Sequence, residues 1–257
     1  MQHIIKTENL KKSFFVKIGK IEVLKGINLE IKKGDFGIIF GPSGCGKSTL
    51  LHTLIGLEEP TEGKVYFEGK DLYSLDEDER ADLREKKIGM LYQQPTWITS
   101  LRVLENVAFP LILRGYSFKK ASSLAFSALA QVGMEKWKDF FPQELSSGQQ
   151  QKISLARAIV SNPDFLIADE PTGNLDEKSG EKLLELLKWQ NRIFGRTILM
   201  VTHDLRYLSY GDVLYQMLDG KIIKVYREKD REELLLHIKK EILRPLEKVK
   251  GLSLIHI

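Results

Sequence analysis

A glycine-rich loop carries the strongest chemical signal in this chain of 257 residues. Its pattern is G-x-x-x-x-G-K-[ST], preceded by the apolar segment 36–40 and followed by helical spacing over 48–57. Glycines let backbone N–H groups curve around an anion, and the N-terminus of the following helix adds a positive field. We therefore predict a site for the phosphates of a nucleoside triphosphate. It is formed by Gly41, Pro42, Ser43, Gly44, Cys45, Gly46, Lys47, Ser48 and Thr49.

Three side chains of the loop have separate expected roles. Lys47 should reach the β- and γ-phosphates, and the Ser48 hydroxyl should bind Mg²⁺. The alternative is a glycine-rich turn with a chance lysine, and the flanking strand and helix argue against it. Cys45 is interpreted as a small filler side chain because no partner base for a catalytic thiol is evident. Its alkylation should nonetheless block nucleotide binding.

A pair of acidic residues follows the apolar segment 165–168, which is typical of a buried strand. Open α/β sheets bind ligands at the carboxyl ends of their strands, so these acids should emerge beside the triphosphate. We expect Asp169 to hold Mg²⁺ through water and Glu170 to act as the general base. His203 follows the next buried strand, 197–201, and should reach the same edge; a satisfied core histidine is the alternative.

The elements that position these residues indicate an α/β protein. Strands that alternate with helices predict a mainly parallel sheet with helices on its faces. Strand patterns cover 21–24, 27–31, 36–40, 63–69, 165–168 and 197–201. Helical patterns cover 48–57, 117–132 and 177–191, and we expect the block from 76 to 141 to be helical in character.

With 42% hydrophobic and 29% charged residues, the composition is ordinary for a soluble globular protein, and the features below lead us to expect a cytoplasmic one. No apolar run approaches the roughly 18–20 residues needed to cross a bilayer, and the N-terminus has no signal pattern. The single cysteine rules out an internal disulfide.

The net charge of +4 equals the surplus of ten Lys/Arg over six Asp/Glu between Lys221 and Lys250. The rest of the chain is therefore neutral, and nucleic-acid binding is not expected. We interpret the basic segment as a solvated helix face, with contact to anionic lipid headgroups as the alternative. Helical spacing at Leu235, Ile238 and Ile242 should end at Pro245, and residues 251–257 fit no motif.

A third motif suggests a family. The segment Leu145-Ser146-Ser147-Gly148-Gln149 begins 24 residues ahead of Asp169 and resembles the L-S-G-G-Q signature of ATP-binding cassette (ABC) ATPases. The family's Q-loop, D-loop and switch-histidine motifs have counterparts in the same order: Tyr92-Gln93, Asn174-Leu175-Asp176 and Val201-Thr202-His203-Asp204. Phe14 lies where the family usually places an aromatic ring that stacks on adenine, although Phe15 beside it is an alternative. The resemblance covers roughly residues 4–225.

The resemblance implies a P-loop NTPase (RecA-like) core with a mainly parallel sheet. To this core it adds an N-terminal antiparallel β subdomain and a helical subdomain inserted at about 94–145. The ABC ATPase domain would span 1–228, and 229–257 would be a helical or disordered tail. The implied activity is ATP hydrolysis, with ATP and Mg²⁺ as cofactors.

The resemblance also implies a composite site between two copies that close head-to-tail over two MgATP molecules. Catalysis would fall to Lys47, Gln93, Glu170 and His203, and Mg²⁺ would be held by Ser48, Gln93 and Asp169. Nucleotide contacts would further include Phe14, the loop 41–49, Asp176 and the signature residues Ser146, Gly148 and Gln149, the signature coming from the other copy. Ser147 replaces the family's first signature glycine, and we expect weakened or unchanged turnover rather than loss.

Segments 104–115 and 169–176 resemble the lipoprotein-release and macrolide-export ATPases. That subgroup implies a separate integral membrane permease, export or extraction of a lipoprotein, peptide or antibiotic, and a peripheral position on the inner face of the cell membrane. One alternative is an ABC ATPase acting on DNA or the ribosome. The 52 residues from Gln93 to Leu145 leave no room for its usual coiled coil. The other is a non-catalytic cell-division scaffold, which the presence of Glu170 and His203 disfavours.

Overall fold

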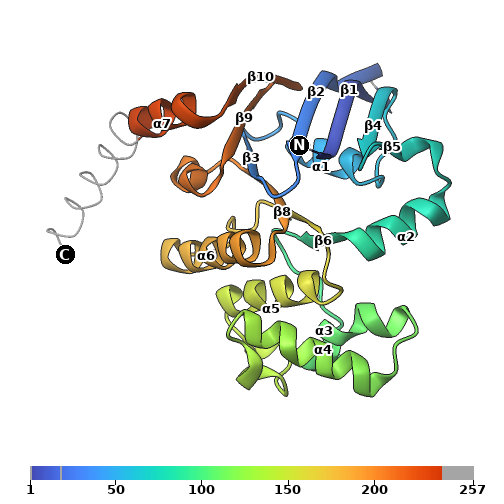
Figure 1. Ribbon diagram of the computed structural model, residues 1–257, viewed down its shortest axis with the longest axis vertical. Helices are drawn as coiled ribbons and strands as arrows, with labels where there is room; N and C mark the ends of the chain where they lie inside the picture. The colour runs from blue at the N-terminus through green and yellow to red at the C-terminus, as the bar shows by residue number, and fades with distance from the viewer. Residues whose placement is uncertain (1, 18, 239–257) are drawn as a thin grey trace, which may run out of the picture.

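The chain folds around two β-sheets, as seen in a computed structural model that describes residues 2–17 and 19–238 (Figure 1). One sheet is antiparallel and has the strand order β2-β1-β4-β5; the other has the order β10-β9-β3-β8-β7-β6. In the second sheet, only β10 runs antiparallel to its neighbour. The predicted α/β fold, with a mainly parallel sheet and an N-terminal antiparallel one, is therefore confirmed.

The elements alternate along the chain as the sequence predicts. The strands are β1 (His3–Val16), β2 (Gly19–Lys32), β3 (Phe36–Phe40), β4 (Glu62–Phe67), β5 (Lys70–Asp71), β6 (Ile88–Leu91), β7 (Phe165–Asp169), β8 (Thr197–Thr202), β9 (Val213–Leu218) and β10 (Lys221–Tyr226). The α-helices are α1 (Lys47–Leu54), α2 (Glu77–Lys87), α3 (Val103–Leu113), α4 (Phe118–Gln131), α5 (Ser147–Ile159), α6 (Glu177–Phe194) and α7 (Glu228–His237). Short 3-10 helices are η1 (Leu72–Ser74), η2 (Glu135–Trp137), η3 (Pro142–Glu144) and η4 (Leu205–Tyr210).

The register of the parallel strands brings their carboxyl ends to one edge. Phe40 at the end of β3 pairs with Thr202 at the end of β8, and Asp169 at the end of β7 pairs with Val201. Ligand-binding residues in open α/β sheets come from this edge. The glycine-rich loop, the acidic pair and His203 therefore begin from neighbouring points.

Two hydrophobic clusters cover the two faces of the larger sheet. Phe36 and Ile38 of β3 belong to a cluster shared with α3, α4, α5 and α6, whereas Ile39 belongs to one shared with α1 and the antiparallel sheet. Alternate side chains of a strand point to opposite faces, so both faces of β3 are buried. In Figure 1, α5 and α6 lie on one side of the larger sheet, and the antiparallel sheet lies on the other.

The structure corrects the expectation of helical character throughout 76–141. Ile88–Leu91 forms β6, which pairs in parallel with β7 at the edge of the larger sheet. Four apolar residues directly after a charged helix are too few to show a period, which explains why the sequence pattern missed the strand. Residues 21–24 and 27–31, expected as two strands, belong to the single long strand β2.

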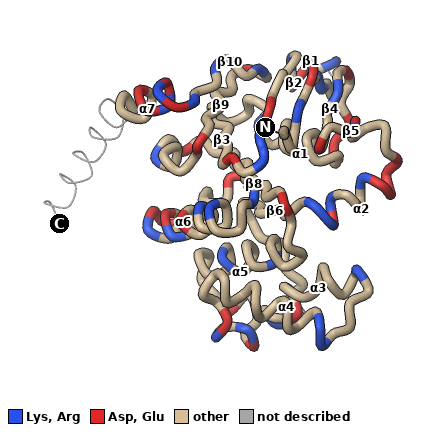
Figure 2. Tube along the Cα trace, in the orientation of Figure 1, with Lys and Arg blue, Asp and Glu red and all other residues tan. Residues whose placement is uncertain are grey.

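Helix α2 is strongly charged, with acidic residues in its first turn and basic ones in its last (Figure 2). Helix α7 ends next to Ile238, which is buried in the cluster of α3 to α6. Ile242, Pro245 and residues 251–257 lie outside the described residues. Among the described residues, no helix is both long and apolar enough to cross a membrane.

Candidate functional site

The glycine-rich loop, residues 41–49, joins β3 to α1 and surrounds a hollow of about 230 Å³. Gly41 is needed because a Cβ atom there would lie 2.1 Å from the Met217 carbonyl oxygen. Gly46 has φ of 101°, a left-handed backbone conformation that residues other than glycine rarely adopt. The buried Lys47 ammonium donates to the carbonyl oxygens of Gly41 and Pro42 at 3.0 Å each. The lysine is thus held at the mouth of the loop by backbone acceptors.

A hydroxyl and a carboxylate meet beside this hollow. The Ser48 hydroxyl, in the first turn of α1, donates to Asp169 Oδ1 at 3.1 Å. Burial raises the pKa of Asp169 above its ordinary value, while the hydrogen bond from Ser48 opposes that shift. No described group of three or more His, Cys, Asp or Glu side chains could hold a metal ion. A serine hydroxyl and one carboxylate instead suit Mg²⁺, which keeps several waters and takes its remaining ligands from phosphates.

Glu170 contacts two other predicted site residues. Its Oε1 lies 3.7 Å from Lys47 Nζ, and its Oε2 lies 2.9 Å from His203 Nδ1. The backbone of Glu170 has φ of 44°, in the left-handed region. The structure therefore joins Lys47, Glu170 and His203, from three different segments, at the carboxyl edge of the sheet.

Gln93 and Asp176 lie beside this group rather than within it. The Gln93 side chain packs on Gly173, where a Cβ atom would come within 2.5 Å of its Nε2. Asp176 caps the N-terminus of α6: it accepts from the Ser179 hydroxyl at 2.7 Å and from the Ser179 N–H at 3.0 Å. The Ser179 hydroxyl is the main reason that the pKa of Asp176 lies below its ordinary value.

The signature residues form the N-terminus of α5. Ser146 is its N-cap and shares a capping box with Gln149, so the hydrogen bonds between these two residues close within the first turn. Gly148 faces α6, because a Cβ atom there would lie 3.0 Å from Ser179 Oγ. Ser147 is exposed and starts the regular helix. Among the described residues, no hydrogen bond or ion pair joins this segment to Lys47, Asp169 or Glu170.

Phe14 and Phe15 differ in their surroundings. The Lys12 ammonium lies 4.9 Å from the centre of the Phe14 ring and donates to the carbonyl oxygen of Glu59, shortly after α1. Phe15 is 81% exposed. Neither ring is among the residues that line the hollow of the glycine-rich loop. Stacking of Phe14 on adenine therefore stays a prediction, with Phe15 as the alternative.

Sequence reasoning missed Gln151, a buried side chain that links the signature helix to the sheet edge. Its Nε2 donates to the carbonyl oxygens of Tyr92, beside Gln93, and of Pro171, just after Glu170, at 2.7 and 2.8 Å. The sequence held one signal for this role: Gln151 lies four residues before Leu155, on the same buried face of α5. A polar residue on such a stripe needs partners, and here they are the two junctions next to the site.

The family is decided by a comparison with known sequences. Residues 24–173 match the family model described as ABC transporter. The chain belongs to the ABC transporter family. It is an ATP-hydrolysing, ATP-binding subunit with ATP and Mg²⁺ as cofactors.

Two relatives of this ABC protein have names that state the transport system to which they belong. The lipoprotein-releasing system ATP-binding protein LolD of Buchnera aphidicola is 38% identical over 219 residues, 85% of this chain and 96% of LolD. The macrolide export ATP-binding/permease protein MacB of Campylobacter fetus is 40% identical over 247 residues, 96% of this chain and 38% of MacB.

A solved relative is the ATP-binding cassette MJ0796 of Methanocaldococcus jannaschii, in a dimeric post-hydrolysis state bound to ADP and Pi. It matches with a TM-score of 0.81 at 38% identity, covering 87% of this chain and 98% of that cassette. The α/β cassette fold of this protein is therefore shared along nearly its whole described length.

Proposed function

We propose that two copies of this ABC protein close head-to-tail over two MgATP molecules and drive a separate membrane permease. The observation that carries this proposal is the contact group Ser48–Asp169, Lys47–Glu170 and Glu170–His203. It assembles phosphate-binding and catalytic groups at one edge, while the signature helix of the same chain stays apart. The dimeric state of MJ0796 supports the arrangement.

Within each site, one chain binds the nucleotide. Phe14 stacks on the adenine, the loop 41–49 holds the phosphates, and Lys47 exchanges its backbone acceptors for the β- and γ-phosphates. Ser48, Asp169 and Gln93 hold Mg²⁺, which when bound neutralises charge on the phosphate oxygens.

The reaction needs little covalent chemistry from the protein, because positioning and electrostatic stabilisation do most of the work. Glu170 orients and polarises the attacking water, and His203 holds Glu170 through its Nδ1 contact at 2.9 Å. The partner's Ser146, Gly148 and Gln149 cover the γ-phosphate. The N-terminus of α5 suits that role because backbone N–H groups and the helix dipole favour anions. Asp176, which caps α6 beside Gly148, lies at the same interface.

We propose further that the ABC ATPase domain spans 1–228, with a helical subdomain at about 94–145 and a tail from 229. The permease docks beside Gln93 and the helical subdomain. The similarity to LolD and MacB supports export or extraction of a lipoprotein, peptide or antibiotic. The protein then works in the cytoplasm, peripheral to the inner face of the cell membrane.

Glu170→Gln tests the composite site. The substitution keeps the size and hydrogen bonding of the side chain but removes the base, so ATP binds and is not hydrolysed. We expect a MgATP-dependent dimer in size-exclusion chromatography and an ATPase rate at least about a hundredfold below wild type. A variant that stays monomeric and hydrolyses ATP at the wild-type rate would contradict the proposal.

Detergent extraction from native cells tests the permease. We expect the chain to be recovered with an integral membrane subunit. Recovery only with nucleic acid or ribosomes would favour the non-transport alternative instead. Recovery with a membrane protein, but without ATP turnover in the complex, would favour the scaffold.

A further inference from the structure

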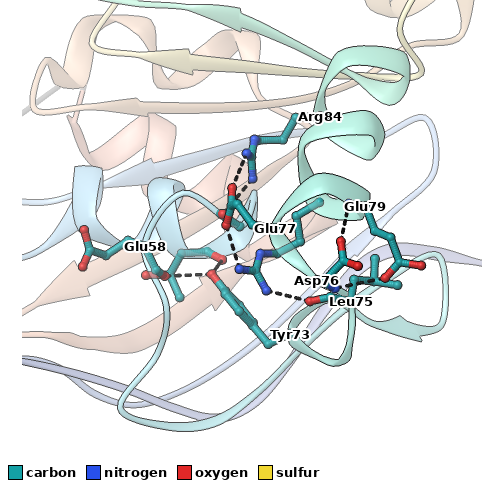
Figure 3. Close-up of polar contacts among 10 residues, drawn as sticks. Glu58, Tyr73, Leu75, Asp76, Glu77, Glu79 and Arg84 are labelled. Carbon is teal, nitrogen blue, oxygen red and sulfur yellow. Dashed lines mark hydrogen bonds and ion pairs between the residues drawn. The ribbon is translucent and has the colours of Figure 1, made fainter.

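The C-terminal end of the P-loop helix α1 is held by residues that lie outside the phosphate site (Figure 3). The Tyr73 hydroxyl lies 2.7 Å from the carbonyl oxygens of both Thr53 and Glu58. Burial raises the pKa of Tyr73 above its ordinary value, so the hydroxyl stays protonated and shares its one proton between these acceptors. The last carbonyls of a helix lack the usual partners within the helix. Tyr73 adds a side-chain donor at Thr53, whose carbonyl oxygen also accepts from the N–H groups of Ile55 and Gly56.

A second contact comes from α2. Arg84 Nη1 donates to the carbonyl oxygen of Gly56, two residues after α1 ends, at 2.8 Å. Glu77, the first residue of α2, accepts from Arg84 Nη2 and Arg80 Nη2 at 2.7 Å each. Arg80 also donates to the Leu75 carbonyl oxygen at 2.7 Å. Figure 3 shows Glu77 with Arg84 above it and the turn at Leu75 below.

Apolar packing of helix α2 is limited to partly buried side chains such as Leu83, which lies against the core cluster that contains α1. None of the residues of α2 is buried, and its start is fixed by a capping box between Asp76 and Glu79. Its C-terminal end leads directly into β6, which pairs with β7, the strand that carries Asp169. Helix α2 thus connects the larger sheet, through β6, to the C-terminal end of α1, through Arg84.

We propose that Arg84 and Tyr73 are positioning residues that hold the C-terminal end of α1 so that Lys47 and Ser48, at its N-terminal end, are placed to bind MgATP. The inference rests on the proposed roles of Lys47 and Ser48. It extends the nucleotide site to contacts at the far end of the helix.

Both geometry and charge explain how contacts at the C-terminal end of α1 can affect its N-terminal end. Helix α1 has eight residues and is therefore about 12 Å long. A tilt set at one end displaces the other, and misplacement of about 1 Å at a reacting centre can cost about a hundredfold in rate. A guanidinium at the C-terminal end of α1 also complements the negative end of the helix dipole, whose positive end faces the phosphates.

The experiment measures the dissociation constant of the full chain for a non-hydrolysable ATP analogue with Mg²⁺, alongside its melting temperature. We expect Arg84→Ala to weaken binding at least about fivefold, within the range typical of coupling between separate sites. Arg84→Lys should recover part of the loss, because an ammonium can still donate to Gly56 but lacks the planar pair of Nη groups that reaches Gly56 and Glu77 together. Tyr73→Phe keeps the ring and loses the hydroxyl, and should weaken binding at least about twofold.

Lys86→Ala is the matched control. Lys86 lies in the same helix and pairs with Asp82 at 2.6 Å on the exposed surface, without contact to α1. Its removal should leave binding within about twofold of wild type. A merely structural role for Arg84 would lower the melting temperature and leave the dissociation constant unchanged, which would overturn the proposal.

Two further outcomes separate this inference from the proposed function. If wild type binds the analogue, Lys47→Ala does not, and both Arg84→Ala and Tyr73→Phe bind as wild type does, the positioning role alone is wrong. If Lys47→Ala binds as tightly as wild type, the phosphate site itself is wrongly assigned. Should Arg84→Ala fail to fold, Tyr73→Phe decides the question.

Discussion

The sheet edge and the N-terminus of α5 carry the two halves of the proposed site, and they are built in different ways. At the edge, Lys47, Glu170 and His203 come from distant segments and contact one another. At α5, Ser146 and Gln149 are three residues apart and contact each other. The edge is thus assembled by the tertiary fold of one chain. The α5 terminus is a local structure, and its contact with the nucleotide of a second chain is part of the proposed dimer.

One side chain joins the two halves within a single chain. Gln151 lies in the second turn of α5 and donates to backbone carbonyls on both sides of the edge, at Tyr92 and Pro171. The signature helix cannot move far from the edge without breaking these hydrogen bonds. The two halves of one chain are therefore separate in chemistry but mechanically connected.

The comparison is tested most strongly by mixing variants. Glu170→Gln removes the proposed base at the sheet edge and should lower ATP turnover about a hundredfold or more. Ser146→Ala removes a signature hydroxyl and should lower ATP turnover about tenfold or more. An equal mixture should recover about a quarter of wild-type turnover, since half the dimers are mixed and each mixed dimer retains one intact site of two. Steady-state ATPase assays of the separate and mixed proteins measure this. No recovery on mixing would mean that both halves act within one chain.

Gln151→Met tests the connection between the halves. Methionine has a similar shape but cannot donate, so two backbone carbonyls lose their partner and the free energy of unfolding should fall by about 1–3 kcal/mol. Urea unfolding of the variant measures the change. The matched control is Gln143→Met at an exposed position, which should shift stability by less than about 0.5 kcal/mol. Equal behaviour of the two variants would show that Gln151 is not a structural link.

Alkylation of Cys45 tests whether the sheet edge of one chain binds MgATP without the signature residues of a second chain. Burial raises the pKa of its thiol above the ordinary value, and only the thiolate reacts with iodoacetamide, so alkylation should accelerate about tenfold per pH unit from pH 7 to 9. MgATP should slow the reaction in wild type and equally in Ser146→Ala. Mass spectrometry of the quenched protein follows the modification. Protection that disappears in Ser146→Ala would place the signature in the first binding step.

Ser147→Gly should have the smallest effect. Ser147 is exposed and opens a regular helix, so its side chain imposes no unusual backbone conformation. Restoring the family's glycine should change ATP turnover by less than about threefold. A large gain, measured in the same ATPase assay, would mean that the hydroxymethyl group hinders the contact between chains.

Much of the sheet edge could be predicted because its signals are local. The loop 41–49 and the acids after β7 are short motifs next to strands, and parallel pairing then brings His203 to the same edge. The capping box of α5 is equally readable as Ser146-x-x-Gln149, although the family resemblance predicts these residues only as ligands.

The remaining features depend on contacts between distant segments. β6 is only four residues long, and its pairing with β7 supplies the stability that its own pattern does not indicate. Arg84 and Gln151 bind backbone carbonyls, which every residue possesses, so no partner type appears in the sequence. Side chains that recognise backbone are therefore the hardest part of such a site to predict.

The left-handed backbone of Glu170 has a consequence for how this protein changes over generations. A residue other than glycine at φ of 44° carries a local cost of about 1–2 kcal/mol. Glycine or asparagine would adopt the same turn more easily, so variants selected only for heat tolerance should acquire them at position 170. Retention of the acid in a lineage would then report continued selection for turnover. Its replacement would identify descendants that have kept the fold and abandoned the chemistry.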